Sequence, residues 1–211
     1  MTQRQRWLRR WFSLVLAGCV AIALTGCSLD AFRTQAAEGT RLVYSVLSDP
    51  ATFNPALSKE SPNIFALTYV GLVGQNGVTA EVEPELAESW SFSEDDLRLT
   101  LTLREGLRWS DGEPLTVEDV LFTYNEVLFN ETIPNNGRDG FRIGADGVFP
   151  TVTAVGDRQV EFALPEPFAP LLRLLGGEIL PAHILRPKVE TLDSEGNPAF
   201  NSCLLYTSDA A

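Results

Sequence analysis

The residues of this chain that could do chemistry are mostly carboxylates. Acidic side chains gather over positions 81–96, as Glu81, Glu83, Glu85, Glu88, Glu94, Asp95 and Asp96. A glycosidase needs two carboxyl groups on opposite sides of the bond that it cleaves. Carboxylates this close together in a sequence are more often solvated charges on a loop or helix. The cluster therefore favours a charged surface over a hydrolytic site.

The sequence contains one histidine, His183, within the apolar segment ILPAHIL. A lone histidine among apolar neighbours is more often a packed or surface residue than a catalytic base. Any serine or cysteine nucleophile would need this histidine as its base. Gly71, Gly74 and Gly77 do not have the spacing of a dinucleotide-binding motif, and the sequence contains no P-loop. We therefore expect no catalytic residue, no cofactor and no enzymatic activity.

The N-terminus has the three parts of a secretory signal: basic residues up to Arg10, an apolar stretch over residues 11–24, and small residues before Cys27. The apolar stretch is shorter than the about 20 residues of a permanent transmembrane helix. The motif LTGC at positions 24–27 resembles the lipobox of bacterial lipoproteins, whose cysteine is acylated and becomes the first residue. We expect residues 1–26 to be a signal peptide and Cys27 to be a lipid anchor. In the alternative, an ordinary signal is cleaved and Cys27 is incidental.

The other two cysteines are not expected to bind or bridge anything. Cys19 lies inside the predicted signal, and Cys203 begins the segment CLLYTSDAA, residues 203–211, which resembles a translated sequencing adapter. A natural C-terminus is the alternative; we expect genuine sequence to end at Ser202 and the chain to be an N-terminal fragment. No cysteine pair then remains for a disulfide or a thiolate metal site. Asp139 and Asp146 do not have the spacing of a calcium loop, so no metal site is predicted.

The composition is that of a globular protein, with 45% hydrophobic and 21% charged residues. The net charge is −12, although the first 26 residues hold four arginines and no Asp or Glu. The rest of the chain is therefore strongly acidic. Such a surface repels phosphate backbones, which excludes nucleic acid as an expected partner.

The elements that must position these residues mix strands and helices without strict alternation. Residues 27–40 read as a flexible polar tether, residues 42–47 as a buried strand, residues 48–63 as a loop and residues 64–73 as a helix ending before Gly74. Residues 97–103 alternate apolar and polar side chains, which predicts a strand with one buried face.

The second half of the chain predicts a capped helix and a hairpin. After a tight turn at Asp111-Gly112, Thr116 and Asp119 have the spacing of a capping box. The helix should bury one face against the strand 97–103; that face consists of Val117, Val120, Leu121, Tyr124 and Leu128. Further along we expect an exposed loop at 135–147, a hairpin of strands 152–155 and 159–164, and short helices at 168–175 and 182–185.

The stretch PELAESWSFSEDDLRLTLTLREGLRWSDGEPLTVEDVLFTYNEVL, residues 84–128, resembles the signature region of extracellular solute-binding proteins of family 5, the peptide/nickel class. Three further segments resemble that family: SDPATFNPALS, YVGLVGQNG and TVTAVGDRQVEFALPEPFAPLLRLLGGEILPAHIL. Together they cover residues 41 to about 187. The resemblance implies a mixed α/β protein with a partial periplasmic-binding-protein-like type II fold. Residues 41–202 would form the N-terminal part of the solute-binding domain: the start of lobe I (41–76), a small accessory domain (77–165) and a return into lobe I (166–202).

The same resemblance implies a function and a site. Members are substrate receptors of ABC importers, so this chain would capture a peptide or related solute outside the cytoplasmic membrane, as a lipid-anchored monomer, and deliver it to the permease. One cleft wall would be the loop after the first strand, carried here by Ser58, Lys59, Glu60 and Ser61. Such a loop could offer backbone groups to an extended peptide, although an exposed Lys59–Glu60 ion pair is an equal alternative. The motif WSDG, with a buried Trp109, would act as scaffold rather than as a metal site.

Two other functions remain open from the sequence alone. A secreted hydrolase acting on cell-wall or peptide material would need a base or nucleophile that the sequence does not place. A structural lipoprotein would need no small ligand at all. Hydrolysis of labelled substrates would identify the first, and a melting temperature that rises with a solute would exclude the second.

Overall fold

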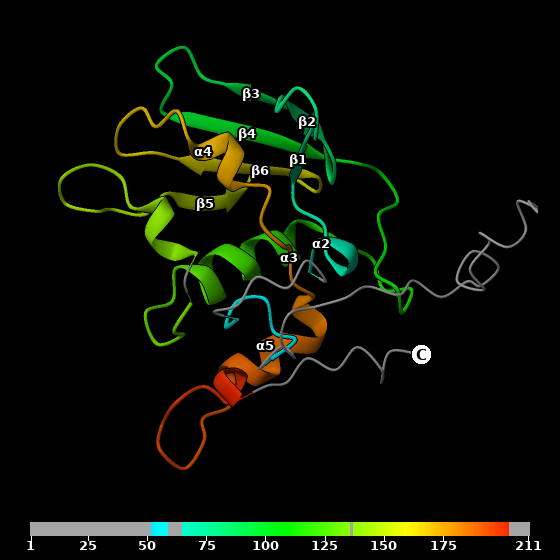
Figure 1. Ribbon diagram of the computed structural model, residues 1–211, viewed down its shortest axis with the longest axis vertical. Coiled ribbons are helices and arrows are strands. Elements are labelled where there is room, and N and C mark those ends of the chain that lie inside the picture. The colour runs from blue at the N-terminus through cyan, green and yellow to red at the C-terminus, as the bar shows by residue number, and fades with distance from the viewer. Residues whose placement is uncertain (1–51, 59–64, 136, 203–211) are drawn as a thin grey trace, which may run out of the picture. The chain divides into compact units, whose positions relative to one another are not determined.

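The computed structural model describes residues 52–58, 65–135 and 137–202 (Figure 1). The chain divides into two units, residues 1–47 and 48–211, and every described residue belongs to the second. The predicted signal, the tether, Cys27 and the strand 42–47 lie outside the described residues, as does the segment 203–211.

The main sheet has four antiparallel strands in the order β3-β4-β6-β5. These are β3 (Ala87–Phe92), β4 (Arg98–Leu103), β5 (Thr151–Ala154) and β6 (Gln159–Ala163). Alternate residues of β4 are buried, and Leu99 and Leu101 lie opposite Phe162 and Val160 of β6. The predicted strand 97–103 and the predicted hairpin are therefore confirmed, with ends that differ by one residue.

One face of the sheet is covered by the capped helix. The capping box is confirmed: Thr116 accepts a hydrogen bond from the backbone of α3 (Val117–Leu121), and the Asp119 side chain accepts one from Thr116 N. The helix contacts β5 and β6 (Figure 1). The sequence predicts that it packs against the strand 97–103, which is β4 and lies on the other side of β6 from β5. The ring of Tyr124 packs edge-on against Phe162 of β6, with centroids 5.0 Å apart.

Beyond Leu121 the helix continues as a π-helix, η3 (Phe122–Leu128). A π-helical turn holds more residues than an α-helical turn, so the predicted apolar face does not continue straight along the axis. Leu121 and Leu128 are half-buried, whereas Phe122 and Val127 are fully buried on another side. The helix therefore contributes to two cores.

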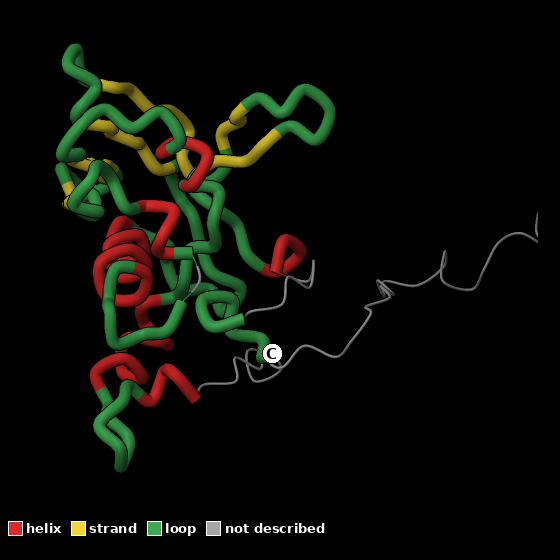
Figure 2. Tube along the Cα trace, turned by 60° about the vertical axis from the view of Figure 1, so that its left-hand side comes forward, coloured by secondary structure: helices red, strands yellow, loops and turns green. Residues whose placement is uncertain are grey.

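The second core joins segments that are far apart in the sequence. It consists of Phe122, Val127, Ile133, Leu180, Ala182, Leu185 and Phe200. Five of them come from η3, the helix α5 (Ala182–Glu190) and the 3-10 helix η5 (Ala199–Ser202), and Ile133 and Leu180 come from the loops after η3 and before α5. Ala56 and Leu57, from the loop after the predicted first strand, pack against it. This core holds that loop beside η3, α5 and η5. Figure 2 shows these helices below the strands.

The predicted helix at 64–73 is wrong over most of its length. Among the described residues of this range, only α2 (Phe65–Thr68) is helical, and the chain then extends into β1 (Val73–Gln75), which pairs with β2 (Val82–Pro84). Backbone pairing outcompetes the helix here, because the amides of Leu72 and Val73 both donate to the carbonyl of Leu175. A short apolar run fits a strand and a helix equally well.

Three smaller expectations also change. The loop 135–147 contains a 3-10 helix, η4 (Arg138–Phe141), and buries Phe141 and Ile143, so it is not simply exposed. The two short helices appear as α4 (Leu171–Leu174), shorter than expected, and α5, which runs five residues past its expected end and includes Pro187. Trp109 is half-buried at the edge of the first core rather than enclosed. Its ring lies beside that of His183, with centroids 6.4 Å apart.

Candidate ligand-binding site

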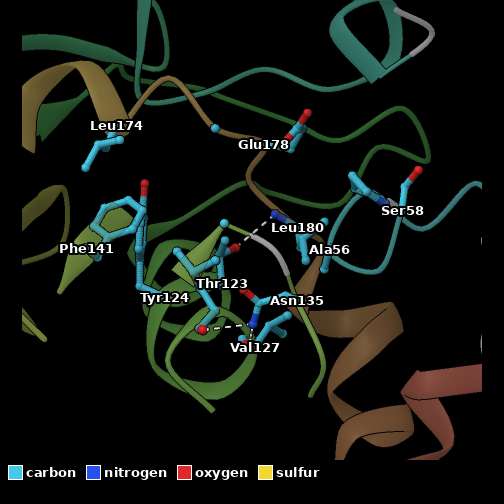
Figure 3. A pocket seen from close by; sticks show the side chains of 14 residues that line it. Ala56, Ser58, Thr123, Tyr124, Val127, Asn135, Phe141, Leu174, Glu178 and Leu180 are labelled. Atoms are coloured by element: carbon cyan, nitrogen blue, oxygen red, sulfur yellow. Dashed lines mark hydrogen bonds between the residues drawn. The ribbon is translucent and has the colours of Figure 1, made fainter. Parts of the chain in front are cut away.

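A cavity of about 240 Å³ opens between three segments of the described chain (Figure 3). One wall is the loop 55–58, one is the π-helix with the loop that follows it, and the third is the segment 174–180 after α4. Its polar lining residues are Ser58, Thr123, Tyr124, Asn135 and Glu178. The apolar lining residues outnumber them, as expected for a site that removes a small molecule from water; they are Pro55, Ala56, Val127, Leu128, Phe141, Leu174 and Leu180.

Ser58 is the predicted site residue that the structure places in this cavity. Lys59, Glu60 and Ser61 lie outside the described residues. The loop before them is turned by Asn54, which is fully buried. Its side-chain oxygen accepts from the amide of Ala56 at 3.1 Å, and its carbonyl accepts from the amide of Ser58 at 3.0 Å. Such an Asx turn fixes where the loop presents Ser58.

Hydrogen bonds to the helix fix the third wall. The hydroxyl of Thr123 donates to the carbonyl of Asp119 at 2.7 Å and accepts from the amide of Leu180 at 2.9 Å. The Asp119 carboxylate also accepts from the amide of Ala182 at 2.9 Å. Sequence reasoning found the capping role of Asp119 and missed this second one, because a capping pattern carries no information about a partner 63 positions away.

The loop after the π-helix is held by two polar side chains. Asn135 donates to the carbonyl of Leu128 at 2.9 Å. The guanidinium of Arg138 donates to the carbonyls of Asn130 and Ile133 at 2.9 and 2.8 Å. The bond to Leu128 satisfies a carbonyl that the end of η3 leaves without a partner, and the two bonds from Arg138 hold the loop that follows. They therefore give the cavity a fixed wall at the end of η3.

Tyr124 and Glu178 line the cavity from two of its walls. Figure 3 shows the Tyr124 hydroxyl directed from the helix toward the segment that carries Leu174 and Glu178. Tyr124 is only 2% exposed. Burial, and after it the charge of Glu178, raises the pKa of the Tyr124 phenol well above its ordinary value, so the hydroxyl is neutral. Neither residue was singled out as a site residue from the sequence, since one reads as a core aromatic and the other as a surface acid.

A second polar contact joins His183 to Asp111, outside the cavity lining. His183 Nε2 lies 2.7 Å from Asp111 Oδ2, and both side chains are about one-third exposed. The other oxygen of Asp111 accepts from the amide of Glu113 at 3.0 Å, within the predicted tight turn, where Gly112 has a φ of +93°. The hydrogen bond from His183, and then that from Glu113, lowers the pKa of Asp111. The pair fastens the turn to α5.

Two further properties of the described chain bear on function. In residues 52–58, 65–135 and 137–202, no three His, Cys, Asp or Glu side chains are arranged to hold a metal ion. Within the same ranges, no helix has the length and apolar character needed to cross a membrane.

Comparison with known proteins identifies relatives of this region. Residues 81–200 match the middle part of the bacterial extracellular solute-binding proteins, family 5. The chain is 32% identical over 159 residues to a probable D,D-dipeptide-binding periplasmic protein of Escherichia coli, DdpA, covering 70% of this chain and 28% of that protein.

Two solved structures show the same fold. NikZ of Campylobacter jejuni, in complex with Ni(L-His), superposes with a TM-score of 0.59 at 25% identity, over 71% of this chain and 29% of NikZ. The oligopeptide-binding protein AppA of Bacillus subtilis, in complex with a nonapeptide, has a TM-score of 0.57 at 26% identity, over 67% of this chain and 27% of AppA. The chain spans about a quarter to a third of the length of such relatives.

Proposed function

The chain belongs to family 5 of the bacterial extracellular solute-binding proteins, and on that premise we propose that it is part of the substrate receptor of an ABC importer. Its partial periplasmic-binding-protein fold, mixed in helix and sheet, is shared with NikZ and AppA. The proposed activity is capture of a peptide or related small solute outside the cytoplasmic membrane and its delivery to the permease.

The observation that carries this proposal is the cavity beside the loop 55–58. The family resemblance assigns the loop after the first strand to one cleft wall, and Ser58 of that loop lines a mostly apolar cavity. That combination is the usual form of a small-molecule site. Lys59, Glu60 and Ser61 complete the proposed wall.

In our proposal the second wall belongs to sequence beyond this chain, because the matched regions cover only 25% and 28% of two relatives. We assign residues 41–76 and 166–202 to lobe I and residues 77–165 to a small accessory domain. A ligand would be enclosed when a second lobe closes on the first, which removes water and satisfies the ligand from both sides. The 211 residues alone would leave one face of the ligand in water.

Anchoring and assembly are further parts of the proposal. Acylated Cys27, after removal of residues 1–26, would hold a monomer at the outer face of the membrane or in the periplasm, with residues 27–40 as the tether. Metabolic labelling with a radioactive fatty acid tests this: the label should appear on the native protein and disappear in Cys27→Ala. Equal label on both would contradict the anchor.

The rival functions can be compared with these findings. The comparisons give the hydrolase no support, since the relatives reported are binding proteins. A structural lipoprotein would use no solute, so a melting temperature that rises with added peptide would exclude it.

Calorimetric titration of the complete protein and of the 211-residue chain with one set of dipeptides and tripeptides tests the central proposal. We expect measurable binding by the complete protein and none by the shorter chain. Ordering a flexible peptide costs entropy that one wall cannot offset. Comparable micromolar binding by the shorter chain would show that the ligand does not lie between two walls.

A further inference from the structure

The helix α2 and the residues just after it expose two large aliphatic side chains. Leu67, in α2, is 56% exposed, and Val70, two residues after the end of the helix, is 47% exposed. No other described helix or strand packs extensively against α2. Figure 2 shows α2 as the short helix on the right, apart from the other helices. The described part of the chain therefore leaves this side of α2 uncovered.

A groove of about 340 Å³ adjoins this exposed pair. Val70 lines the groove, so one side chain belongs to both features. The groove runs between the hairpin of β1 and β2 and the chain around α4, and its lining residues include Gly71, Val73, Val82, Arg173 and Gly176. One exposed aliphatic residue needs no explanation, but two beside a groove mark a surface that another segment of protein can cover. We call Leu67, Val70 and these groove residues the α2 surface.

Backbone hydrogen bonds give the α2 surface a fixed shape. The carbonyl of Val70 accepts from the amide of Ile179 at 3.1 Å, and the amide of Leu72 donates to the carbonyl of Leu175 at 2.9 Å. These bonds hold residues 70–72 against residues 175–179, so Val70 cannot turn inward without breaking them. A segment that packs here meets a surface that is already ordered, which lowers the entropy lost in the contact.

The relatives contain much sequence that could cover this surface. The matched regions make up only 25%, 34% and 28% of three curated relatives. Most of the length of each relative therefore has no counterpart in this chain. When a hydrophobic core is built from distant segments, the side chains of one segment stay exposed until the others are present.

We propose that sequence beyond residue 202 packs permanently on the α2 surface in the complete protein. The packing segment is apolar, because Leu67, Val70 and Val82 offer aliphatic side chains to it. This inference goes beyond the proposed function, since it concerns how the complete fold is assembled and requires no solute.

The position of the groove gives this packing a further effect. The chain 173–180 contributes to two hollows: Arg173 and Gly176 line the groove, whereas Leu174 and Glu178 line the cavity beside the loop 55–58. A segment that fills the groove therefore also holds this wall of the cavity in place.

Thiol labelling of the complete protein tests whether the α2 surface is covered. Leu67→Cys and Val70→Cys, each made in a background without other reactive thiols, are treated with a maleimide. The matched control is Val78→Cys, because Val78 is 95% exposed between β1 and β2. The thiols at positions 67 and 70 should react at least about tenfold more slowly than the control, since a covered thiol reacts only when the contact opens. Melting temperatures verify that each variant is folded.

A photoreactive side chain then identifies the covering segment. A diazirine amino acid replaces Leu67 in the complete protein, and mass spectrometry identifies the peptides that become cross-linked on irradiation. We expect cross-links within one molecule to residues beyond 202. Their yield should be the same with and without added peptide and at every protein concentration.

Each outcome has one meaning. Labelling at positions 67 and 70 as fast as at position 78 overturns the proposal. Cross-links to residues before 203, cross-links between two copies, or protection that requires a solute also overturn it. Slow labelling together with solute-independent cross-links beyond residue 202 supports it. None of these measurements depends on solute binding, so the proposed function stands or falls separately in the calorimetric titration.

Discussion

His183 Nε2 lies 2.7 Å from Asp111 Oδ2, which joins the turn after β4 to helix α5 across 72 positions of the chain. The Trp109 ring lies beside the same imidazole. The contact explains why an apolar segment contains a histidine: the ring packs against an aromatic on one side and bonds to a carboxylate on the other. Its geometry makes the pair a fastening between two elements of the scaffold.

The first prediction concerns acid stability. The pKa of Asp111 is lowered in the folded protein, so the folded state binds this proton more weakly than the unfolded chain. The carboxylate therefore stabilises the fold above its ordinary pKa of about 3.9, and this contribution is lost as the pH falls through the lowered value. In Asp111→Asn, the melting temperature should fall less steeply between about pH 6 and pH 2 than in the native protein.

Thermal melts across this pH range provide the measurement. Asp157→Asn is the control, because Asp157 is an exposed turn residue that forms no hydrogen bond in the described ranges. Identical acid slopes for the native protein and Asp111→Asn would show that the His183 contact adds no stability.

The second prediction concerns Asp119, which is 4% exposed and accepts backbone hydrogen bonds from both Thr116 and Ala182. Asp119→Ala should lower the free energy of unfolding by about 2–4 kcal/mol, because it removes a cap and leaves a buried amide without an acceptor. Asp119→Asn keeps one acceptor oxygen and should lose less. Urea unfolding followed by tryptophan fluorescence would compare them, and equal losses would contradict the two-sided role.

The third prediction separates two neighbours on the capped helix. Val120 is fully buried against the sheet, whereas Leu121 is half-buried. Val120→Asp should abolish cooperative unfolding, because burying a carboxylate without a partner costs several kcal/mol. Leu121→Asp can turn its charge toward water and should cost about 1 kcal/mol. Circular dichroism melts test this order, and a greater loss in Leu121→Asp would mean that the helix is rotated.

The fourth prediction tests a close backbone contact. A Cβ atom added at Gly71 would lie 2.6 Å from the carbonyl carbon of Gly176, closer than real side chains approach. Gly71→Ala should therefore destabilise the protein by about 1–3 kcal/mol, through forced separation of two backbones. A Cβ at Gly77 meets nothing within 4 Å, so Gly77→Ala is the matched control. Equal stabilities would disprove the contact.

Local patterns predicted the parts of this fold that local interactions decide. The alternation of β4 follows from one buried sheet face, and the Thr116–Asp119 box is formed by residues three apart. The helix expected at 64–73 failed because Leu72 and Val73 pair with Leu175, about a hundred positions away. No pattern within ten residues can show which distant backbone will compete for an amide.

The candidate site also combines a residue that the sequence indicated with residues that it could not indicate. Ser58 was reached by resemblance, and it lines the cavity. Glu178 and Tyr124 could not be predicted to line one cavity, because that depends on a π-helix and on the return of the chain after α4. A tyrosine at helical spacing predicts a core residue, which is also correct here, since its ring is in the core and only its hydroxyl faces the cavity.

The two cores on the π-helix also set an order of events during synthesis. The sheet is complete once residue 163 has been made, whereas Phe122 receives its cover from Leu180, Leu185 and Phe200. A ribosome adds roughly 5–20 residues per second. For several seconds, the side of the helix that faces the sheet would be buried in the nascent chain, while its other side would still be exposed to water. The cavity needs residues up to 180. Within the described chain, the cavity is therefore completed after the sheet.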